Sequence, residues 1–270
     1  MKRFLAIILA GLMLLSLAAC GGKKNDEKVL GVVEAEGFTA ILINHDAEKH
    51  PDIHKELNTK TYSNLSAAIL DLQNGKITSL ACEKIVAEYI LAHNEGYVIG
   101  GTELCKTNFS MMTKDTNTEV YDILNNTLKE MKADGTLDSL IANELKAYIN
   151  SDPAPKDLPK FDGARTIRIG VTGDMPPMDF VASNGKAAGF NIALLTEIAN
   201  RAQVNIELVQ IETGARTMAL SSNKVDAVFW TKSVTCVKCS ETFAEEIAGT
   251  LVTESYFSDA SVIIMPKSNK

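Results

Sequence analysis

Residues 166–190, TIRIGVTGDMPPMDFVASNGKAAGF, carry the pattern that decides the fold. The β-branched residues at 166–171 predict a strand, and Pro176-Pro177 predicts a turn. Asn184-Gly185 predicts a hairpin, and the residues from Phe190 to Ala202 have helical spacing. This order of strand, turn, hairpin and helix is typical of the beginning of an α/β domain, yet it begins past the middle of a 270-residue chain.

Short strands and helices alternate on both sides of this stretch. On its C-terminal side we expect a strand at 204–209, a helix at 214–222 and strands at 225–230 and 260–265. On its N-terminal side we expect strands at 29–33, 77–82, 97–100 and 109–113, helices at 65–73, 83–93, 120–133 and 136–149, and a loop or loose helix at 47–62. Such alternation predicts a parallel sheet covered by helices, which is an α/β fold.

The stretch is preceded by a linker. Residues 150–163, NSDPAPKDLPKFDG, hold three of the seven prolines in the chain. On either side of the linker, LQNGKITSL at 72–80 and LSSNKVDAV at 220–228 share a pattern of helix end, polar turn with lysine, and strand. Two similar α/β units produce such an echo, and so does a chance likeness between two helix-to-strand junctions; we favour two units.

The first twenty residues predict export from the cytoplasm. Lys2 and Arg3 precede an uncharged apolar run at 4–19, which has the length of a signal peptide. The ending Leu17-Ala-Ala-Cys20 resembles a bacterial lipobox, in which Cys20 becomes lipidated after cleavage at its N-terminal side. Residues 20–28 would then be a tether that holds the protein at the extracellular face of the cell membrane. A plain secretory signal with a chance cysteine is the alternative.

Charge and motif content restrict the classes of function. The formal net charge of −7 argues against a nucleic-acid partner. Cys236-Val-Lys-Cys239 has the spacing of a redox or zinc motif, but all four histidines lie in the other half of the chain. We therefore expect no metal; a disulfide within Cys236/Cys239 or within Cys82/Cys105 stays open. The chain contains no H-E-x-x-H, G-x-S-x-G or phosphate-binding loop, so we expect no catalytic residue and no cofactor.

The chain resembles the bacterial extracellular solute-binding proteins, family 3, which bind polar amino acids for ABC importers. The resemblance implies a two-lobed periplasmic-binding-protein-like fold of type II. In the second half it rests on IRIGVTGDMPPMDF, the N-G-K-x-x-G-F at 184–190, LSSNKVDAV, SVT at 233–235, FAEEI and ESYFSDASVIIMPK. In the first half it rests on LGVVEAEGFT, DLQNGKITSL, EKIVAEYIL and LKEMKADGTLDSL at 128–140.

The order of the two halves is reversed relative to that family, so the chain resembles a circular permutant. The resemblance places lobe 2 at 29–108, a hinge strand and the closing helices of lobe 1 at 109–149, the linker at 150–163, and the lobe 1 sheet with the second hinge strand at 164–270. A fusion of two truncated neighbours is the competing interpretation. Permutation is tolerated where the original termini lie close together at the surface.

The resemblance implies an amino acid or a similar small zwitterion as the ligand, bound between the lobes. It indicates Thr39, Thr231, Ser233 and Lys238 for the ligand carboxylate. Lys238 replaces a family arginine and lacks its bidentate fork, so a solvated surface lysine is the alternative.

The resemblance indicates Glu83 for the ligand ammonium, although a glutamate there also stabilises a helix N-terminus. Thr172 stands where the family often has an aspartate, and Asp174 is a nearby substitute. The apolar wall is expected from Phe38, Met175, Phe180 and Trp230; Met175 replaces a family aromatic, and Trp230 is alternatively a core residue.

The sequence therefore predicts a monomeric, lipid-anchored binding protein that delivers its ligand to the permease and ATPase subunits of an ABC importer. The first alternative is a ligand-sensing lipoprotein without a dedicated importer. The second is an enzyme, because related folds include a dehydratase and a lytic transglycosylase.

Overall fold

The computed structural model describes residues 28–33, 58–151, 153–236, 240, 242–244 and 246–267, without the side chains of residues 101–104 and 236. The predicted signal peptide, Cys20 and the tether up to residue 27 lie outside the described residues, as do Phe38, Thr39, Lys238 and Cys239. Among the described helices, none is long and apolar enough to cross a membrane.

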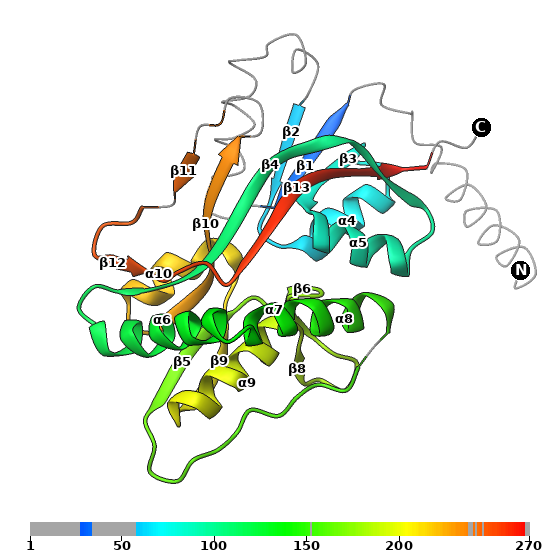
Figure 1. Ribbon diagram of the computed structural model, residues 1–270. Helices are drawn as coiled ribbons and strands as arrows, with labels where there is room; N and C mark the ends of the chain where they lie inside the picture. The colour runs from blue at the N-terminus through cyan, green and yellow to red at the C-terminus, as the bar shows by residue number, and fades with distance from the viewer. Residues whose placement is uncertain are drawn as a thin grey trace, which may run out of the picture.

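A twisted sheet of ten strands forms the centre of the molecule (Figure 1). Its main path has the order β2-β1-β3-β13-β4-β10-β5-β9, while β11 pairs with β10 and β12 pairs with β4. The strands are β1 (Val29–Val33), β2 (Asn58–Tyr62), β3 (Ser79–Glu83), β4 (Tyr97–Lys114), β5 (Thr166–Val171), β9 (Asn205–Gln210), β10 (Ala227–Cys236), β11 (Thr242–Ala244), β12 (Thr250–Val252) and β13 (Phe257–Pro266).

Two parallel half-sheets are joined by two antiparallel strands. β1 pairs in parallel with β2 and β3, which together form the N-terminal half-sheet. β5 pairs in parallel with β9 and β10, which together form the C-terminal half-sheet. Between them, β13 pairs antiparallel with β3 and β4, and β4 pairs antiparallel with β10. In each half-sheet the strand that comes first in the chain, β1 or β5, lies in the centre, and the strand that comes third, β3 or β10, lies next to the antiparallel pair. The predicted α/β class is confirmed.

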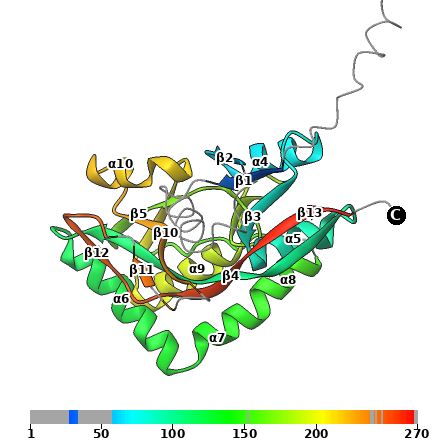
Figure 2. The same cartoon turned by 90° about the horizontal axis from the view of Figure 1, so that it is seen from above.

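Helices cover the sheet. They are α4 (Leu65–Gln73), α5 (Lys84–His93), α6 (Thr118–Ala133), α7 (Thr136–Leu140), α8 (Lys146–Asn150), α9 (Phe190–Ala202) and α10 (Arg216–Ser221), with a π-helical turn at Ile141–Leu145 between α7 and α8. Seen from above, α6 and α8 diverge from α7 (Figure 2). α6 contacts β4 and α9, whereas α8 contacts α5, so this helical segment reaches both half-sheets.

The helical segment is held by a regular apolar stripe. Val120, Leu124, Leu128 and Met131 recur at intervals of three or four residues in α6, and all four are fully buried. This spacing places them on one face of the helix, which packs against the sheet and α9. The opposite face of α6 carries charged residues and faces solvent.

A second, three-stranded sheet has its first strand before the Pro176-Pro177 turn and its other two strands after it. It consists of β6 (Asp174–Met175), β7 (Asp179–Val181) and β8 (Ala187–Ala188), all antiparallel. Gly185 has a φ of 79° in the β7–β8 connection, which confirms the hairpin predicted at Asn184-Gly185.

The turn between the helix and the third strand has the same geometry in both half-sheets, after α4 before β3 and after α10 before β10. In the N-terminal half-sheet, Lys76 N donates to Asp71 O at 2.9 Å after α4. In the C-terminal half-sheet, Lys224 N donates to Ala219 O at 2.9 Å after α10. The residue before each lysine has a left-handed backbone, with φ of 67° at Gly75 and 60° at Asn223. The echo in the sequence therefore corresponds to two turns of one geometry, which favours two similar units over a chance likeness.

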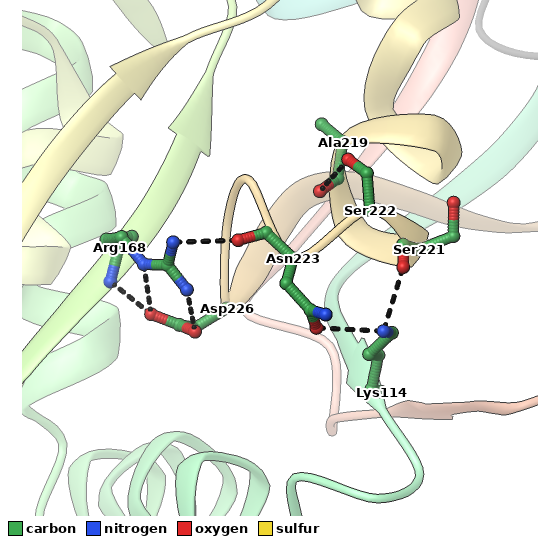
Figure 3. Close-up of polar contacts among 7 residues, drawn as sticks. All are labelled: Lys114, Arg168, Ala219, Ser221, Ser222, Asn223 and Asp226. Atoms are coloured by element: carbon green, nitrogen blue, oxygen red, sulfur yellow. Dashed lines mark hydrogen bonds and ion pairs between the residues drawn. The ribbon is translucent and has the colours of Figure 1, made fainter.

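Side chains reinforce the C-terminal junction (Figure 3). Arg168 in β5 donates to both carboxylate oxygens of Asp226, at 3.1 and 2.8 Å, and to Asn223 O at 2.7 Å. Lys114 Nζ at the end of β4 donates to Ser221 O and Asn223 Oδ1, both at 2.8 Å. These contacts fix the turn against the first strand of its half-sheet and against the long strand β4.

Three predicted elements differ from the structure. Residues 97–100 and 109–113 belong to one strand, β4, because the residues between them pair with β13 and β10. The predicted boundary between 108 and 109 falls inside that strand. Residues 58–62, expected in a loop or loose helix, form the edge strand β2, whose exposed threonine and lysine side chains hide the strand signal.

Candidate ligand-binding site

One buried carboxylate organises the end of β5. Asp179, 1% exposed, accepts hydrogen bonds from Thr172 N at 2.9 Å, Thr172 Oγ1 at 2.5 Å and Gly173 N at 2.6 Å. Asn191 Nδ2 donates to it at 3.0 Å from the first turn of α9, and Trp230 Nε1 donates at 2.8 Å from β10. Asp179 therefore fixes Thr172 and Trp230, two of the predicted site residues, on one acceptor.

Trp230 lies in the core, which is the alternative stated for it. Its side chain is 2% exposed, and its ring meets Phe109 edge-on at 5.4 Å between centroids. β10 changes register against β4 between Val228 and Thr231, and Trp230 has a φ of 70°. This backbone conformation costs a bulky residue about 1–3 kcal/mol, which the hydrogen bond to Asp179 and the ring contact offset. Contact between Trp230 and a ligand stays a prediction.

A buried ion pair connects β3 with β10, the two strands that flank the antiparallel strands β13 and β4. Glu83 ends β3, Lys232 lies in β10, and Glu83 Oε1 accepts from Lys232 Nζ at 2.7 Å. Both side chains are less than a tenth exposed, and Lys232 Nζ lies 5.6 Å from the centre of the Phe109 ring. Burial alone raises the pKa of a carboxyl, but the ammonium of Lys232 outweighs burial and lowers the pKa of Glu83. The predicted ammonium acceptor is therefore ionised and already holds one cation.

A second carboxylate lies near the same pair. Asp259 in β13 accepts from Ile85 N at 2.8 Å, so it satisfies a donor in the first turn of α5. Burial raises the pKa of Asp259 to about 6, and the negative charge of Glu83 contributes to this rise. Glu83 thus interacts with a second carboxylate, that of Asp259, in addition to the buried Lys232.

Asp174 links the small sheet to the N-terminal half-sheet. Its Oδ2 accepts from Leu65 N at 3.1 Å, at the N-terminus of α4, where Asn64 also caps the helix through Ala67 N. Burial raises the pKa of Asp174, and the charge of Asp179 adds to the shift. Asp174 thus contacts the opposite unit of the molecule, 109 residues away in the chain.

Phe180 belongs to an aromatic cluster between α5, α8 and the small sheet. Its ring lies 5.6 Å from Tyr148, edge-on, and 6.3 Å from Tyr89. A cavity of about 220 Å³ opens here, lined by Tyr89, His93, Tyr148, Ser151, Phe180, Val181, Ala182 and Ser183. Phe180 is the one predicted site residue in this lining, so the structure separates it from Glu83 and Trp230.

The other predicted residues are buried or lie outside the described residues. Met175 is 5% exposed and belongs to the main hydrophobic core. Thr231 is 2% exposed, and its Oγ1 has no hydrogen-bond partner among the described residues. Ser233 is half-buried and lies opposite Ala244 of β11. Phe38, Thr39 and Lys238 lie outside the described residues, and the roles of all these residues stay predictions.

Sequence reasoning missed Lys232, Asp179 and Asp259. Lys232 carried a signal, because a lysine inside the apolar stretch VFWTKSV is expected to be buried only when it is paired. Asp179 follows a proline-rich turn and reads as an ordinary polar residue, since nothing local shows that five donors converge on it. Asp259 gives no signal, because its partner Ile85 lies 174 residues away.

Of the cysteines, the structure describes the side chains of Cys82 and Cys105, whereas Cys239 and the side chain of Cys236 lie outside the described residues. Cys82 and Cys105 are free and buried, and burial raises the pKa of both thiols. They pair with Val262 and Ser261 on opposite sides of β13, so one strand separates them by about 10 Å, too far for a disulfide. Among the described residues, no three His, Cys, Asp or Glu side chains are placed to hold a metal ion.

Comparison of the chain with models of known protein families finds a match to one family. Residues 167–270, less than half of the chain, match the model of the bacterial extracellular solute-binding proteins, family 3. No curated protein sequence matches the chain. The family match and the mixed α/β sheet agree with the predicted type II periplasmic-binding-protein-like fold, whereas the circular permutation stays a prediction.

Three solved structures illustrate the likeness at low sequence identity. The periplasmic aliphatic sulphonate-binding protein SsuA from Escherichia coli is 9% identical, with a TM-score of 0.42 over 89% of this chain and 61% of that chain. The GluR0 ligand-binding core in complex with L-glutamate is 12% identical, with a TM-score of 0.42 over 92% and 87%. A putative methionine-binding lipoprotein from Bacillus subtilis is 10% identical, with a TM-score of 0.43 over 90% and 84%.

Proposed function

We propose that the whole chain binds an amino acid or a similar small zwitterion between its two half-sheets, because residues 167–270 match the model of the bacterial extracellular solute-binding proteins, family 3. The observation that carries this proposal is the ionised, buried Glu83 at the carboxyl end of β3, facing the neighbouring unit through Lys232. Ligands of open α/β sheets bind at the carboxyl ends of parallel strands, which is where Glu83 lies.

Glu83 has the properties that recognition of an ammonium group requires. A buried carboxylate is costly unless a cation compensates it, and such a site therefore selects ligands that bring a positive charge. Its role at the helix N-terminus does not compete, because the structure shows no side-chain cap from Glu83 to α5. Glu83 accepts from Lys232, so a ligand ammonium binds this carboxylate by displacing Lys232 Nζ.

We infer an extracellular, membrane-anchored location and delivery to an ABC importer as part of the same proposal. The apolar run at 4–19 and the ending at Cys20 support export and lipidation, and the family supports permease and ATPase partners. The matched family consists of solute-binding proteins, which supports a binding protein rather than an enzyme. We also propose that the protein is a monomer.

We also infer that the chain is a circular permutant. The family match covers the C-terminal part, and the N-terminal half-sheet repeats the strand order and the junction of the C-terminal half-sheet. Leu30 of β1 lies opposite Ser79, and Leu80 of the same β3 lies opposite Ile264 of β13. The first and last described strands are therefore about 10 Å apart, close enough for a short connection in a parent order.

The binding proposal is tested by thermal unfolding of the purified protein with each of the twenty standard amino acids. A ligand present at 100 times its Kd stabilises the folded state by about 2.7 kcal/mol, which raises the Tm by several degrees. We expect at least one amino acid to do so. An unchanged Tm with every amino acid, confirmed by calorimetric titration, would refute the proposal.

A further inference from the structure

We propose that Lys232 binds the carboxylate of the ligand, and that a zwitterionic ligand replaces the ion pair between Lys232 and Glu83 with two ion pairs of its own. This inference rests on the proposed function and assigns a specificity-determining residue to it. The position expected from the family resemblance is Lys238, six residues later in the chain.

The two charges reach each other across the antiparallel strands. β3 and β10 are separated by β13 and β4, which places their backbones about 14 Å apart along the sheet. The side chains of Glu83 and Lys232 bridge the two intervening strands and meet near Phe109, at 2.7 Å between Oε1 and Nζ. In the proposal, a small ligand takes the place between the two charged groups when they move apart.

A ligand with both charges satisfies both residues. Removing either charge of a buried pair leaves the other uncompensated, which is the costly outcome for such a pair. An α-carboxylate on Lys232 and an α-ammonium on Glu83 keep each residue compensated and add one opposite charge to each. A ligand with a single charge compensates only one of the two residues, so the pair selects zwitterions over simple acids and amines.

Asp259 favours the same orientation of the ligand. Its carboxylate lies close enough to Glu83 for the negative charge of Glu83 to raise the pKa of Asp259, so two carboxylates lie on the Glu83 side of the ion pair. The ammonium of the ligand adds a positive charge to this side of the pair. The Glu83 side is therefore the ammonium side, and Lys232 is the carboxylate side.

The test compares an amino acid with its own amide. The amino acid that gives the largest Tm shift is titrated calorimetrically beside its α-carboxamide, which lacks the carboxylate, and its deaminated acid, which lacks the ammonium. For the unmodified protein we expect the carboxamide to bind about 10- to 100-fold more weakly than the amino acid. In Lys232→Met this preference should vanish, whereas Lys129→Met, which removes an exposed lysine of α6, should keep it.

Glu83→Gln gives the complementary result. It should lose the preference for the amino acid over the deaminated acid and keep some preference over the carboxamide. If Lys232→Met does not fold because Glu83 is left uncompensated, the double variant Lys232→Met/Glu83→Gln removes both charges, a change that buried pairs often tolerate. That protein should bind the amino acid, the carboxamide and the deaminated acid with similar, weak affinities.

The outcomes separate this inference from the proposed function. If the unmodified protein binds an amino acid and Lys232→Met, or the double variant, still prefers it to the carboxamide, the inference is wrong while the proposed function stands. Loss of the preference in Lys238→Met assigns the carboxylate to Lys238 and likewise overturns the inference. If the unmodified protein binds no amino acid, both fail together.

Discussion

At the scale of single residues, Asp179 shows how one carboxylate connects three separate segments. Its donors come from the end of β5, the first turn of α9 and the bulge in β10. An ionised carboxylate accepts several hydrogen bonds at once, and bonds to charged groups contribute about 1.5–3 kcal/mol each. The strained backbone of Trp230 is held in place by this acceptor.

We expect Asp179→Ala to destabilise the protein by about 3–5 kcal/mol, because it leaves several buried donors without an acceptor. The measurement is the urea midpoint of unfolding, followed by tryptophan fluorescence, since Trp230 is the only tryptophan in the chain. Asp157→Ala is the matched control: Asp157 pairs with Lys186 at the surface, and its loss should change stability by less than about 0.5 kcal/mol. Equal effects of the two substitutions would contradict the role given to Asp179.

The raised pKa of Asp259 predicts that the free energy of unfolding depends on pH. Its pKa in the folded protein is about 6, above its ordinary value of 3.8, so the folded state holds the proton more tightly than the unfolded state. The stability from this group is fully present below about pH 4 and is lost as the pH rises through 6. We expect Asp259→Asn to reduce this loss by about 1–2 kcal/mol, measured by urea unfolding between pH 4 and 7. Parallel pH profiles of the two proteins would refute the assignment.

At the scale of elements, the turn residues determine the geometry of the two helix-to-strand turns, α4 to β3 and α10 to β10. Gly75 and Asn223 both adopt the left-handed conformation that glycine and asparagine tolerate best. A Cβ atom at Gly75 would meet no atom within 4 Å, so a substitution there changes only the backbone energy.

We expect Gly75→Ala to cost about 1 kcal/mol and Gly75→Asn to cost less, because asparagine occupies the equivalent turn. The free energy of unfolding from urea titration distinguishes the two variants. An alanine variant as stable as the parent would mean that the turn relaxes to another conformation.

Elements with a strong local pattern were predicted closely, and those with a weak one were not. β5 and α9 lie at the predicted 166–171 and 190–202, because alternating or helically spaced apolar residues define them. β4 was predicted as two strands, and the edge strand β2 was missed, because their polar residues pair with strands that are distant in the chain. Pairing partners of this kind leave no local pattern.

At the scale of the whole molecule, the linker and the gap between β13 and β1 bear on the order of the two half-sheets along the chain. The predicted linker at 150–163 connects α8 to β5: Asn150 ends α8, and residues 151 and 153–163 form no helix or strand. If the chain is a circular permutant, the linker joins what were the N- and C-termini of the ancestral chain. The short gap between β13 and β1 is then the place where the ancestral chain was continuous.

A rearranged chain tests this order. Residues 164–267 are placed first, a flexible Gly/Ser segment of about six residues joins them to residues 29–149, and the linker is removed; such a segment spans the 10 Å gap. We expect cooperative unfolding with a Tm within about 10 °C of the parent and the same response to amino acids. A rearranged chain that stays unfolded, while a chain cut only within the linker folds, would contradict the permutation.

The sequence by itself determined the α/β class, the linker, the repeated junction and the presence of Glu83 at a strand end, because each depends on a pattern within about twenty neighbouring residues. Only the tertiary structure decided that Glu83 pairs with Lys232, 149 residues away, and that Asp174 contacts α4. It also placed Trp230 and Met175 in the core. These contacts arise where the two units meet across β4 and β13, and the relative placement of two units has no periodicity that a sequence can display.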